Sequence, residues 1–309
     1  MNAPILLIGA NGQVGREALP LLGSLGSVVG VRRADLDLTD PQSIRNMVRA
    51  VMPRWIVNAA AYTAVDKAEG DSLTAFAVNG AAPGILGEEA ARIGAPVIHF
   101  STDYVFSGAG DQPWREDDRK GPLSVYGASK LAGERALAES GAAHVIFRTS
   151  WVFSSQGENF LLRILKLAQE REELRVVDDQ HGAPTAAQTL AELVAFTVGK
   201  AEAGAERSGM GLDDAVRPFQ GTYHACSAGS TTWFGFASEF MRLAQLARPE
   251  RGFAKLTPIP SSEYPTPAAR PSNSRMSCEK LTGELGFAMP RWEDATARVM
   301  DELVAEGRI

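Results

Sequence analysis

The sequence predicts an α/β fold in which a doubly wound parallel sheet carries helices on both faces and is followed by a smaller α/β C-terminal lobe. Apolar runs of strand length at 4–9, 55–61 and 96–101 alternate with stretches of helical periodicity. These runs are continuous, as expected of parallel strands that are buried on both faces. A glycine-rich turn directly follows the first run, at the edge where a sheet of this kind binds its ligand.

Composition and charge narrow the classes of protein. With 309 residues, 45% of them hydrophobic and 22% charged, the chain is long enough for one large or two ordinary domains. Its net charge of −6 argues against a broad contact with phosphate backbones, so we expect no nucleic-acid partner. Cys226 and Cys278 give no disulfide framework, and the four histidines show no metal-ligand spacing.

The first residues carry no recognisable targeting signal. The apolar run at 3–10 lacks a positively charged segment before it and a cleavage site after it. No later stretch approaches the roughly eighteen uninterrupted apolar residues of a membrane-spanning helix. We therefore expect a cytoplasmic protein with no membrane partner.

The glycine-rich turn reads G-A-N-G-Q-V-G over 9–15. A helix that begins at Gln13 would direct free backbone N–H groups toward a pyrophosphate. Gly12 permits close approach of the phosphates, and Gly15 permits tight packing of the helix on the strand. A glycine triplet can also be a plain turn between strand and helix, but its place after the first strand favours a dinucleotide site. The residues assigned to this site are Gly9, Gly12, Gln13, Val14 and Gly15.

The tip of the second predicted strand is basic, with Arg32 and Arg33 where NAD-specific proteins usually place a carboxylate. A guanidinium pairs with the 2′-phosphate of NADPH, so Arg32 predicts a preference for NADPH over NADH. The alternative is that both arginines point to solvent. Asp40 is typical of a helix N-cap before proline and predicts a helix over 41–51. Asp37 is either an adenosine contact or a competitor for that cap.

Thr102, Tyr126 and Lys130 form the candidate catalytic group. Thr102 follows a strand-like run and so would lie at a carboxyl end of the sheet, where its hydroxyl can bond a substrate carbonyl. Tyr126 and Lys130 are four residues apart, so on a helix both project from one face. The Lys130 ammonium would then lower the pKa of the Tyr126 phenol toward working pH. A pair with this spacing is often a plain surface pair, and the surrounding motifs are what favour catalysis.

The later part of the chain continues the alternation of elements. Helical periodicity covers 72–94 with a break near Pro83, and strand-like runs lie at 144–150 and 174–178. Further helices are predicted over 159–171, 185–198 and 232–246.

These features divide the chain into two parts. Residues 1–150 form the predicted dinucleotide-binding domain of Rossmann type, which segments within 174–225 rejoin. Residues 151–309 form mainly the substrate-binding lobe. Within it, residues 200–219 are small, polar and without a period, and they predict a flexible surface excursion.

Two features of the second part are candidates for binding substrate. Trp151 stands at the end of a predicted strand, where it either walls a sugar pocket or belongs to the core. The segment 264–276 is proline-rich and leaves no room for regular structure. It carries Arg270, Asn273 and Arg275, which either pin the loop or clamp the phosphates or base of a nucleotide.

Several motifs together resemble the dTDP-4-dehydrorhamnose reductase family of the extended short-chain dehydrogenase/reductase class. The most specific are V-D-K-A-E, R-T-S-W-V and the Y-P-T-P loop, whereas Y-x-x-x-K marks only the superfamily. The resemblance covers nearly the whole chain. It implies reduction of the 4-keto group of dTDP-4-dehydrorhamnose to dTDP-L-rhamnose, with NADPH or NADH as hydride donor, in rhamnose biosynthesis for polysaccharide.

The resemblance also implies roles for individual residues. Thr102, Tyr126 and Lys130 match catalytic positions, and Asp103 and Trp151 match substrate contacts. Cofactor contacts are implied for residues 12–14 and for Asp37, Leu38, Ala61, Tyr62 and Thr63. Members of the family form homodimers with magnesium held by acidic residues between subunits. Glu17 matches one such position, but Gln188 stands where a second carboxylate is expected.

Other functions stay open at this point. A related nucleotide-sugar ketoreductase or epimerase would use the same triad, and relatives that form rhamnose and 6-deoxytalose differ only in configuration at C4. The regulatory subunit of methionine adenosyltransferase also resembles these reductases and would bind NADP without catalysis. Dehydratases of this class place an acid pair after the threonine, and the Tyr104 that follows Asp103 disfavours that chemistry.

Overall fold

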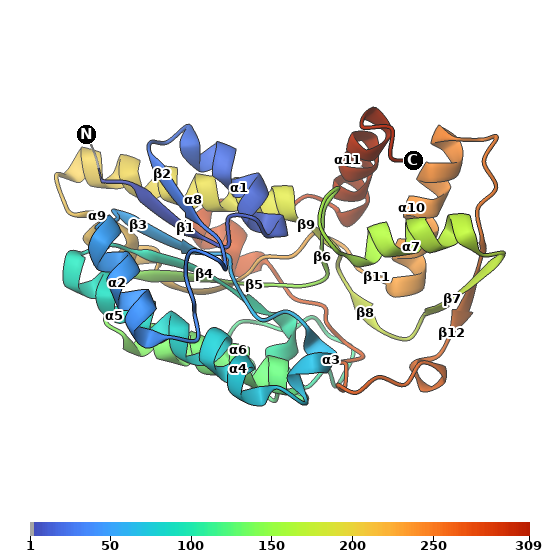
Figure 1. Cartoon of the computed structure of the whole chain (residues 1–309), viewed down its shortest axis with the longest axis horizontal. Coiled ribbons are helices and arrows are strands. Elements are labelled where there is room, and N and C mark those ends of the chain that lie inside the picture. The colour runs from blue at the N-terminus through green and yellow to red at the C-terminus, as the bar shows by residue number, and fades with distance from the viewer. Residues whose placement is uncertain (1–2) are drawn as a thin grey trace.

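The computed structural model describes residues 3–309, which form two lobes (Figure 1). The larger lobe holds a six-stranded sheet in the order β10-β5-β4-β3-β1-β2, and every neighbouring pair is parallel. The order reverses at β1 and β3, because β2 lies on one side of this pair and the later strands lie on the other. The predicted doubly wound sheet is therefore confirmed. Its strands are β1 Ile5–Ile8, β2 Val28–Val31, β3 Trp55–Asn58, β4 Val97–Thr102, β5 His144–Thr149 and β10 Gly221–His224.

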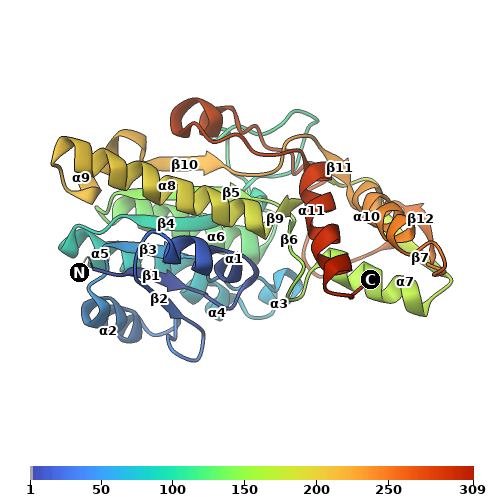
Figure 2. The same ribbon diagram turned by 90° about the horizontal axis from the view of Figure 1, so that it is seen from above.

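Helices cover both faces of this sheet (Figures 1 and 2). On one face, α1 (Gln13–Gly23) packs against α8 (Ala187–Ser208). On the other face, α5 (Ala82–Ile93) packs between α2 (Pro41–Val51) and α6 (Val125–Glu139). All residues of β1, β3 and β5 are buried, which explains the apolar run of β1 and the mainly apolar sequence of β3.

The helix starts and stops follow local signals. Asp40 accepts a hydrogen bond from the Gln42 N–H at 2.9 Å and caps α2, as predicted. The predicted helix over 72–94 is broken as expected, although the irregular part lies just before Pro83: α4 (Ser72–Phe76) leads through the π-helical turn η1 (Ala77–Ala81) into α5. The chain leaves α5 at Gly94, whose φ of 66° favours glycine.

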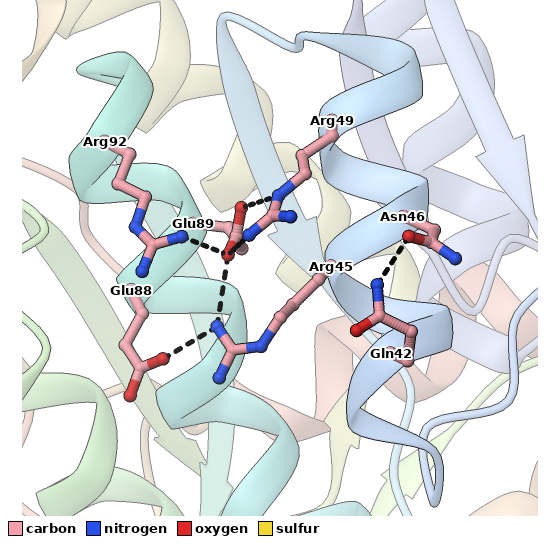
Figure 3. Close-up of polar contacts among 7 residues, drawn as sticks. All are labelled: Gln42, Arg45, Asn46, Arg49, Glu88, Glu89 and Arg92. Carbon is pink, nitrogen blue, oxygen red and sulfur yellow. Dashed lines mark hydrogen bonds and ion pairs between the residues drawn. The ribbon is translucent and has the colours of Figure 1, made fainter.

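A buried carboxylate joins α2 to α5 (Figure 3). Glu89 of α5 accepts two hydrogen bonds from Arg49 at 2.8 Å, one from Arg45 at 3.1 Å and one from Arg92 at 2.9 Å. These arginines lower the pKa of Glu89 to about 2, because their hydrogen bonds outweigh the effect of burial. The network fixes α5 beneath the sheet, and α5 in turn supports α6.

The smaller lobe has its own hydrophobic core between three helices and a parallel strand pair. The pair is β7 (Glu173–Val177) with β12 (Lys255–Ile259). The helices are α7 (Phe160–Glu170), α10 (Trp233–Ala247) and α11 (Trp292–Ala305). Two short pairs complete the lobe: β6 (Val152–Phe153) with β9 (Thr185–Ala186), and β8 (His181–Gly182) with β11 (Thr231–Thr232). Among the helices of residues 3–309, none has the length and apolar character needed to cross a membrane.

The prediction of a flexible excursion at 200–219 is wrong. α8 runs to Ser208, well beyond its predicted end, and α9 (Leu212–Val216) and the 3₁₀ turn η3 (Arg217–Phe219) follow it. The first part of the segment is rich in alanine, glutamate and lysine, which are strong helix formers. Ala201 and Val216 are also buried in the core of the larger lobe. Helix propensity and burial against the core therefore make this segment helical, although its sequence shows no hydrophobic periodicity.

Candidate active site

A cavity of about 490 Å³ opens at the carboxyl ends of β1 to β5. It is the place where the strand order reverses, which is the usual ligand site of an open α/β sheet. Nearly all of the predicted cofactor residues line it, namely Gly9, Gly12, Gln13, Val14, Arg32, Asp37, Leu38, Ala61, Tyr62, Thr63, Tyr126 and Lys130. The structure thus brings together residues from four separate stretches of the sequence.

Gly15 is the one predicted cofactor residue that stands behind the cavity. A Cβ atom at this position would lie 2.1 Å from the Gly9 carbonyl oxygen, so only glycine lets α1 approach the strand. Gly9 itself has a φ of 84°, and the Gly12 N–H closes the turn onto its carbonyl at 2.9 Å. α1 begins at Gln13 without a side-chain cap, so its first N–H groups are free to bind an anion.

The charged residues that follow β2 lie only partly where the sequence predicts. Arg32 lines the cavity with 63% of its side chain exposed, and its Nε lies 3.3 Å from Asp35 Oδ2. Asp37 does not compete for the cap of α2, because its carboxylate accepts bonds from the N–H and the hydroxyl of Thr39 at 2.8 and 2.7 Å. These bonds lower the pKa of Asp37 and leave it charged at the rim of the cavity.

Two members of the candidate catalytic group, Tyr126 and Lys130, line the cavity, and the Thr102 hydroxyl lies within hydrogen-bonding distance of Tyr126. Thr102 ends β4, and its hydroxyl donates to Asp103 Oδ1 at 3.0 Å and accepts from the Tyr104 N–H at 3.2 Å. Tyr126 and Lys130 project from α6, which Ser124 caps through the Gly127 N–H. The helix that the four-residue spacing requires is therefore present.

The pKa of Tyr126 differs from the prediction. Burial raises it to about 12, the charge of Asp103 acts in the same direction, and the Thr102 hydroxyl opposes them. The expected lowering by Lys130 is not seen, because the shift comes from burial, Asp103 and the Thr102 hydroxyl. Tyr126 is consequently protonated across the physiological range, which is the form that a proton donor needs.

Asp103 is a second buried acid beside this group. It is 2% exposed, and burial raises its pKa to about 6, although hydrogen bonds from Ser274 and Thr102 favour its charged form. Ser274 belongs to the proline-rich segment of the smaller lobe. The second lobe therefore reaches the catalytic group directly.

The other predicted substrate residues are held by contacts within the chain. Arg270 forms a two-point ion pair with Asp66 of α3 (Val65–Ala68), at 2.8 and 3.0 Å. The buried Asn273 donates to the Gln112 carbonyl at 2.8 Å and accepts from Arg275 Nε at 2.8 Å. Asn273 and Arg275 thus pin the loop, and their contact with substrate stays a prediction.

Trp151 occupies a strained position between the lobes. Its φ is 49°, a conformation that bulky side chains rarely adopt. Its ring stacks on Trp233 of α10 with centroids 3.8 Å apart, and a Cβ atom at Gly182 would lie 2.7 Å from the ring. The sequence does not reveal this backbone strain, and contact of the ring with a sugar stays a prediction.

The whole chain matches one family. A family model described as RmlD substrate binding domain matches residues 1–305. The dTDP-4-dehydrorhamnose reductase of Escherichia coli K12 is 43% identical over 97% of this chain and 97% of its own length, and that of Burkholderia thailandensis is 43% identical over 98% and 99%. The chain belongs to the dTDP-4-dehydrorhamnose reductase family. As a member of this family it is an oxidoreductase.

Solved structures of dTDP-4-dehydrorhamnose reductases agree with this assignment. The Clostridium acetobutylicum structure superposes with a TM-score of 0.85 at 32% identity and covers 97% of this chain and 99% of that one. The Bacillus anthracis structure, solved in complex with NADP, gives 0.84 at 30% identity and covers 98% and 100%. The family resemblance seen in the sequence motifs is confirmed.

Two buried hydroxyls suit the cavity of this reductase to a cofactor. Ser101 of β4 and Thr149 of β5 line the cavity, are 4% and 8% exposed, and have no hydrogen-bond partner for their hydroxyl oxygens within residues 3–309. Buried polar groups are normally paired, so these two are suited to a polar ligand such as a carboxamide. Sequence reasoning missed both, although their place at strand ends was the signal that could have found them.

The residues do not support the magnesium that the family resemblance implies. Glu17 lies near enough to Glu302 and Glu192 for their charges to raise its pKa, after burial, which has the larger effect. Across residues 3–309, however, no group of three or more His, Cys, Asp or Glu side chains is placed to hold a metal. Gln188, at the start of α8, adds no charge. No step of the reaction is therefore assigned to a metal.

Proposed function

We propose that this chain reduces the 4-keto group of dTDP-4-dehydrorhamnose to give dTDP-L-rhamnose, with NADPH as the hydride donor. The observation that carries the proposal is that Tyr126 and Lys130 line a cavity that begins at the glycine turn, with the Thr102 hydroxyl bonded beside Tyr126. The names of the relatives supply the substrate, and the geometry supplies a proton donor beside a dinucleotide site.

NADPH bound along this cavity supplies the hydride. The pyrophosphate would lie at the start of α1, against the N–H groups of Gln13 and Val14. The carboxamide end would lie near Ser101 and Thr149, whose hydroxyls have no other partner within residues 3–309. Ala59 to Ala61 leave room between these two ends because their side chains are small.

The protein supplies the proton and holds the ketone. Tyr126 is protonated and delivers its proton to the substrate oxygen at C4. The Thr102 hydroxyl, which donates to Asp103 in this structure, would turn its single proton to the same oxygen when the ketone binds. Lys130 is 2% exposed and donates to the Phe100 carbonyl at 2.5 Å, so its position is fixed. Arg270 and Trp151 would contact the sugar nucleotide from the smaller lobe.

The preference for NADPH over NADH rests on Arg32. Its guanidinium lies at the rim of the cavity, and a 2′-phosphate would compete with Asp35 for it. Asp37 and Leu38 line the same rim and would contact the adenosine. The homodimer that the resemblance implies also stays a prediction.

The assay is direct. The purified protein is mixed with dTDP-4-dehydrorhamnose and NADPH, and the loss of nicotinamide absorbance is followed. We expect turnover well beyond one equivalent, and a proton spectrum of the product should show the rhamno configuration rather than 6-deoxytalo. An enzyme that binds NADPH but does not consume it with this substrate would contradict the proposal.

A further inference from the structure

Three buried side chains from three different elements form a chain of contacts behind the catalytic group. Asn58 ends β3, His99 lies in β4 and Lys130 lies in α6, and they are 0%, 1% and 2% exposed. Asn58 Nδ2 lies 3.1 Å from His99 Nδ1, and His99 Nε2 lies 3.3 Å from Lys130 Nζ. We call these three residues the relay.

The backbone fixes the direction of the first hydrogen bond in the relay. The Ala60 N–H can only donate, and it donates to Asn58 Oδ1 at 3.2 Å. The amide nitrogen of Asn58 therefore faces His99, so His99 Nδ1 accepts. Burial and the neighbouring Lys130 hold the pKa of His99 well below its usual range, which keeps the ring neutral. A neutral ring that accepts at Nδ1 carries its proton on Nε2.

That Nε2 proton faces the amino group of Lys130. An ammonium group has three donors and no lone pair, so it cannot accept this proton, whereas a free amine can. Lys130 Nζ also donates to the Phe100 carbonyl at 2.5 Å. The amine form therefore satisfies both neighbours, and the ammonium form satisfies only one.

The charged groups around Lys130 do not cancel this preference for the amine form. Burial lowers the pKa of Lys130 to about 8, and the charge of Glu134, on the same helix, opposes this shift. Glu134 is already paired with Arg148 of β5 at 2.7 and 2.8 Å. Asp103, in the 3₁₀ turn η2 (Asp103–Val105), carries a charge that raises the pKa of Tyr126.

We propose that His99 is a positioning residue that acts through Lys130: held by Asn58 with its proton on Nε2, it donates to the Lys130 amine and favours that form over the ammonium. The inference rests on the proposed role of Lys130 in the reduction. Only the ammonium form of Lys130 supplies a positive charge on the helix face that Tyr126 shares, so the relay sets the pH above which that charge is lost.

The first test measures the tautomer and does not depend on activity. The protein is labelled with ¹⁵N-histidine, and the His99 signals are identified by their loss in His99→Gln. We expect Nε2 to be protonated and Nδ1 to be bare in the native protein, and Asn58→Asp to reverse this pattern, because a carboxylate can only accept from Nδ1–H. A native His99 with its proton on Nδ1 overturns the proposal, even if the protein proves to be an active reductase.

The second test follows the pH dependence of kcat/KM. Activity falls as Lys130 loses its proton, so the native enzyme should show an alkaline limb near pH 8. His99→Phe removes the Nε2 donor and Asn58→Asp reverses it. Both changes favour the ammonium and should move the limb to higher pH by on the order of one unit.

A matched control uses another buried histidine. His144 begins β5, and its ring bonds the Ala142 carbonyl at 3.0 Å rather than the relay. His144→Gln should leave the limb where it is. If His99→Phe and Asn58→Asp bind NADPH normally and their alkaline limbs lie at the same pH as that of the native enzyme, the proposal is overturned. If the variants fail to fold, the spectrum of the native protein still decides it.

Discussion

Arg270 of the proline-rich loop and Asp66 of α3 form a two-point ion pair, Nη2 to Oδ2 at 2.8 Å and Nη1 to Oδ1 at 3.0 Å. The pair joins the smaller lobe to the Rossmann lobe beside the catalytic group. Asp66 also accepts from the Ala268 N–H at 3.2 Å, so a single carboxylate orients both the loop backbone and the guanidinium. These bonds lower the pKa of Asp66 and keep it charged.

Asp66→Asn should therefore weaken substrate binding more than it weakens turnover. The amide keeps the size of the side chain but loses the charge that holds Arg270. We expect KM for the sugar nucleotide to rise about two- to fivefold, because the pair is partly exposed, with kcat nearly unchanged. Lys67→Gln, one residue away, is the control. An unchanged KM in Asp66→Asn would show that the pair does not position Arg270.

Tyr126→Phe should abolish most turnover. The ring keeps its place in α6 and its edge contact with Tyr104, whose ring centroid lies 5.7 Å away. Loss of a positioned proton donor typically costs about 10²–10⁴-fold in rate. Steady-state kinetics with saturating substrate, together with NADPH binding by fluorescence, separate this from a folding defect. A variant that binds NADPH and turns over at the native rate would remove Tyr126 from the mechanism.

Arg32→Ala should reduce discrimination between the two nicotinamides. A charge-assisted contact is worth about 1.5–3 kcal/mol, or roughly ten- to a hundredfold. The 63% exposure of this side chain and its competing contact with Asp35 place the expected effect near the lower figure. The measurement is kcat/KM with NADPH and with NADH, in native protein, Arg32→Ala and Arg33→Ala. A loss that is equal for both cofactors would mean that Arg32 does not read the 2′-phosphate.

Glu89→Gln should lower stability in a pH-dependent way (Figure 3). The folded pKa of about 2 lies below the ordinary value of 4.5, so the charged carboxylate stabilises the fold above about pH 4.5. This contribution is lost as the pH falls toward 2. We expect a cost of about 1–3 kcal/mol at pH 7, measured by urea unfolding, and a smaller cost at pH 3. Glu88→Gln is the control, and an equal cost in both variants would contradict this account.

The parts of the fold that the sequence predicts correctly are those with local causes. The glycine turn at 9–15 and the Asp40 cap depend on backbone conformation and on neighbours within a few residues, so their signals are complete in the local sequence. The segment 200–219 failed for a different reason. Its burial comes from contacts with the core of the larger lobe, and a search for periodicity cannot detect such contacts.

The sequence predicts which residues form the candidate site, but it does not predict how deeply each one is buried. The sequence places Tyr126 and Lys130 on one helix face, yet the pKa of each is set mainly by burial, which depends on the whole fold. His99 gave no motif, because its partners stand about 30–40 positions away in the chain and meet it only when β3, β4 and α6 pack. Ser274 reaches Asp103 from the other lobe for the same reason.

The central claim is that this chain delivers a hydride to C4 of a dTDP-keto-sugar and that Tyr126 supplies the proton. The most direct measurement uses NADPH in which both hydrogens at C4 of the nicotinamide are deuterium, with dTDP-4-dehydrorhamnose as the substrate and a proton spectrum of the isolated product. The account predicts one deuterium at C4 of dTDP-L-rhamnose for each NADPH consumed, and product formation slowed about 10²–10⁴-fold with Tyr126→Phe. Product without deuterium at C4, or equal labelling by Tyr126→Phe at the native rate, would contradict it.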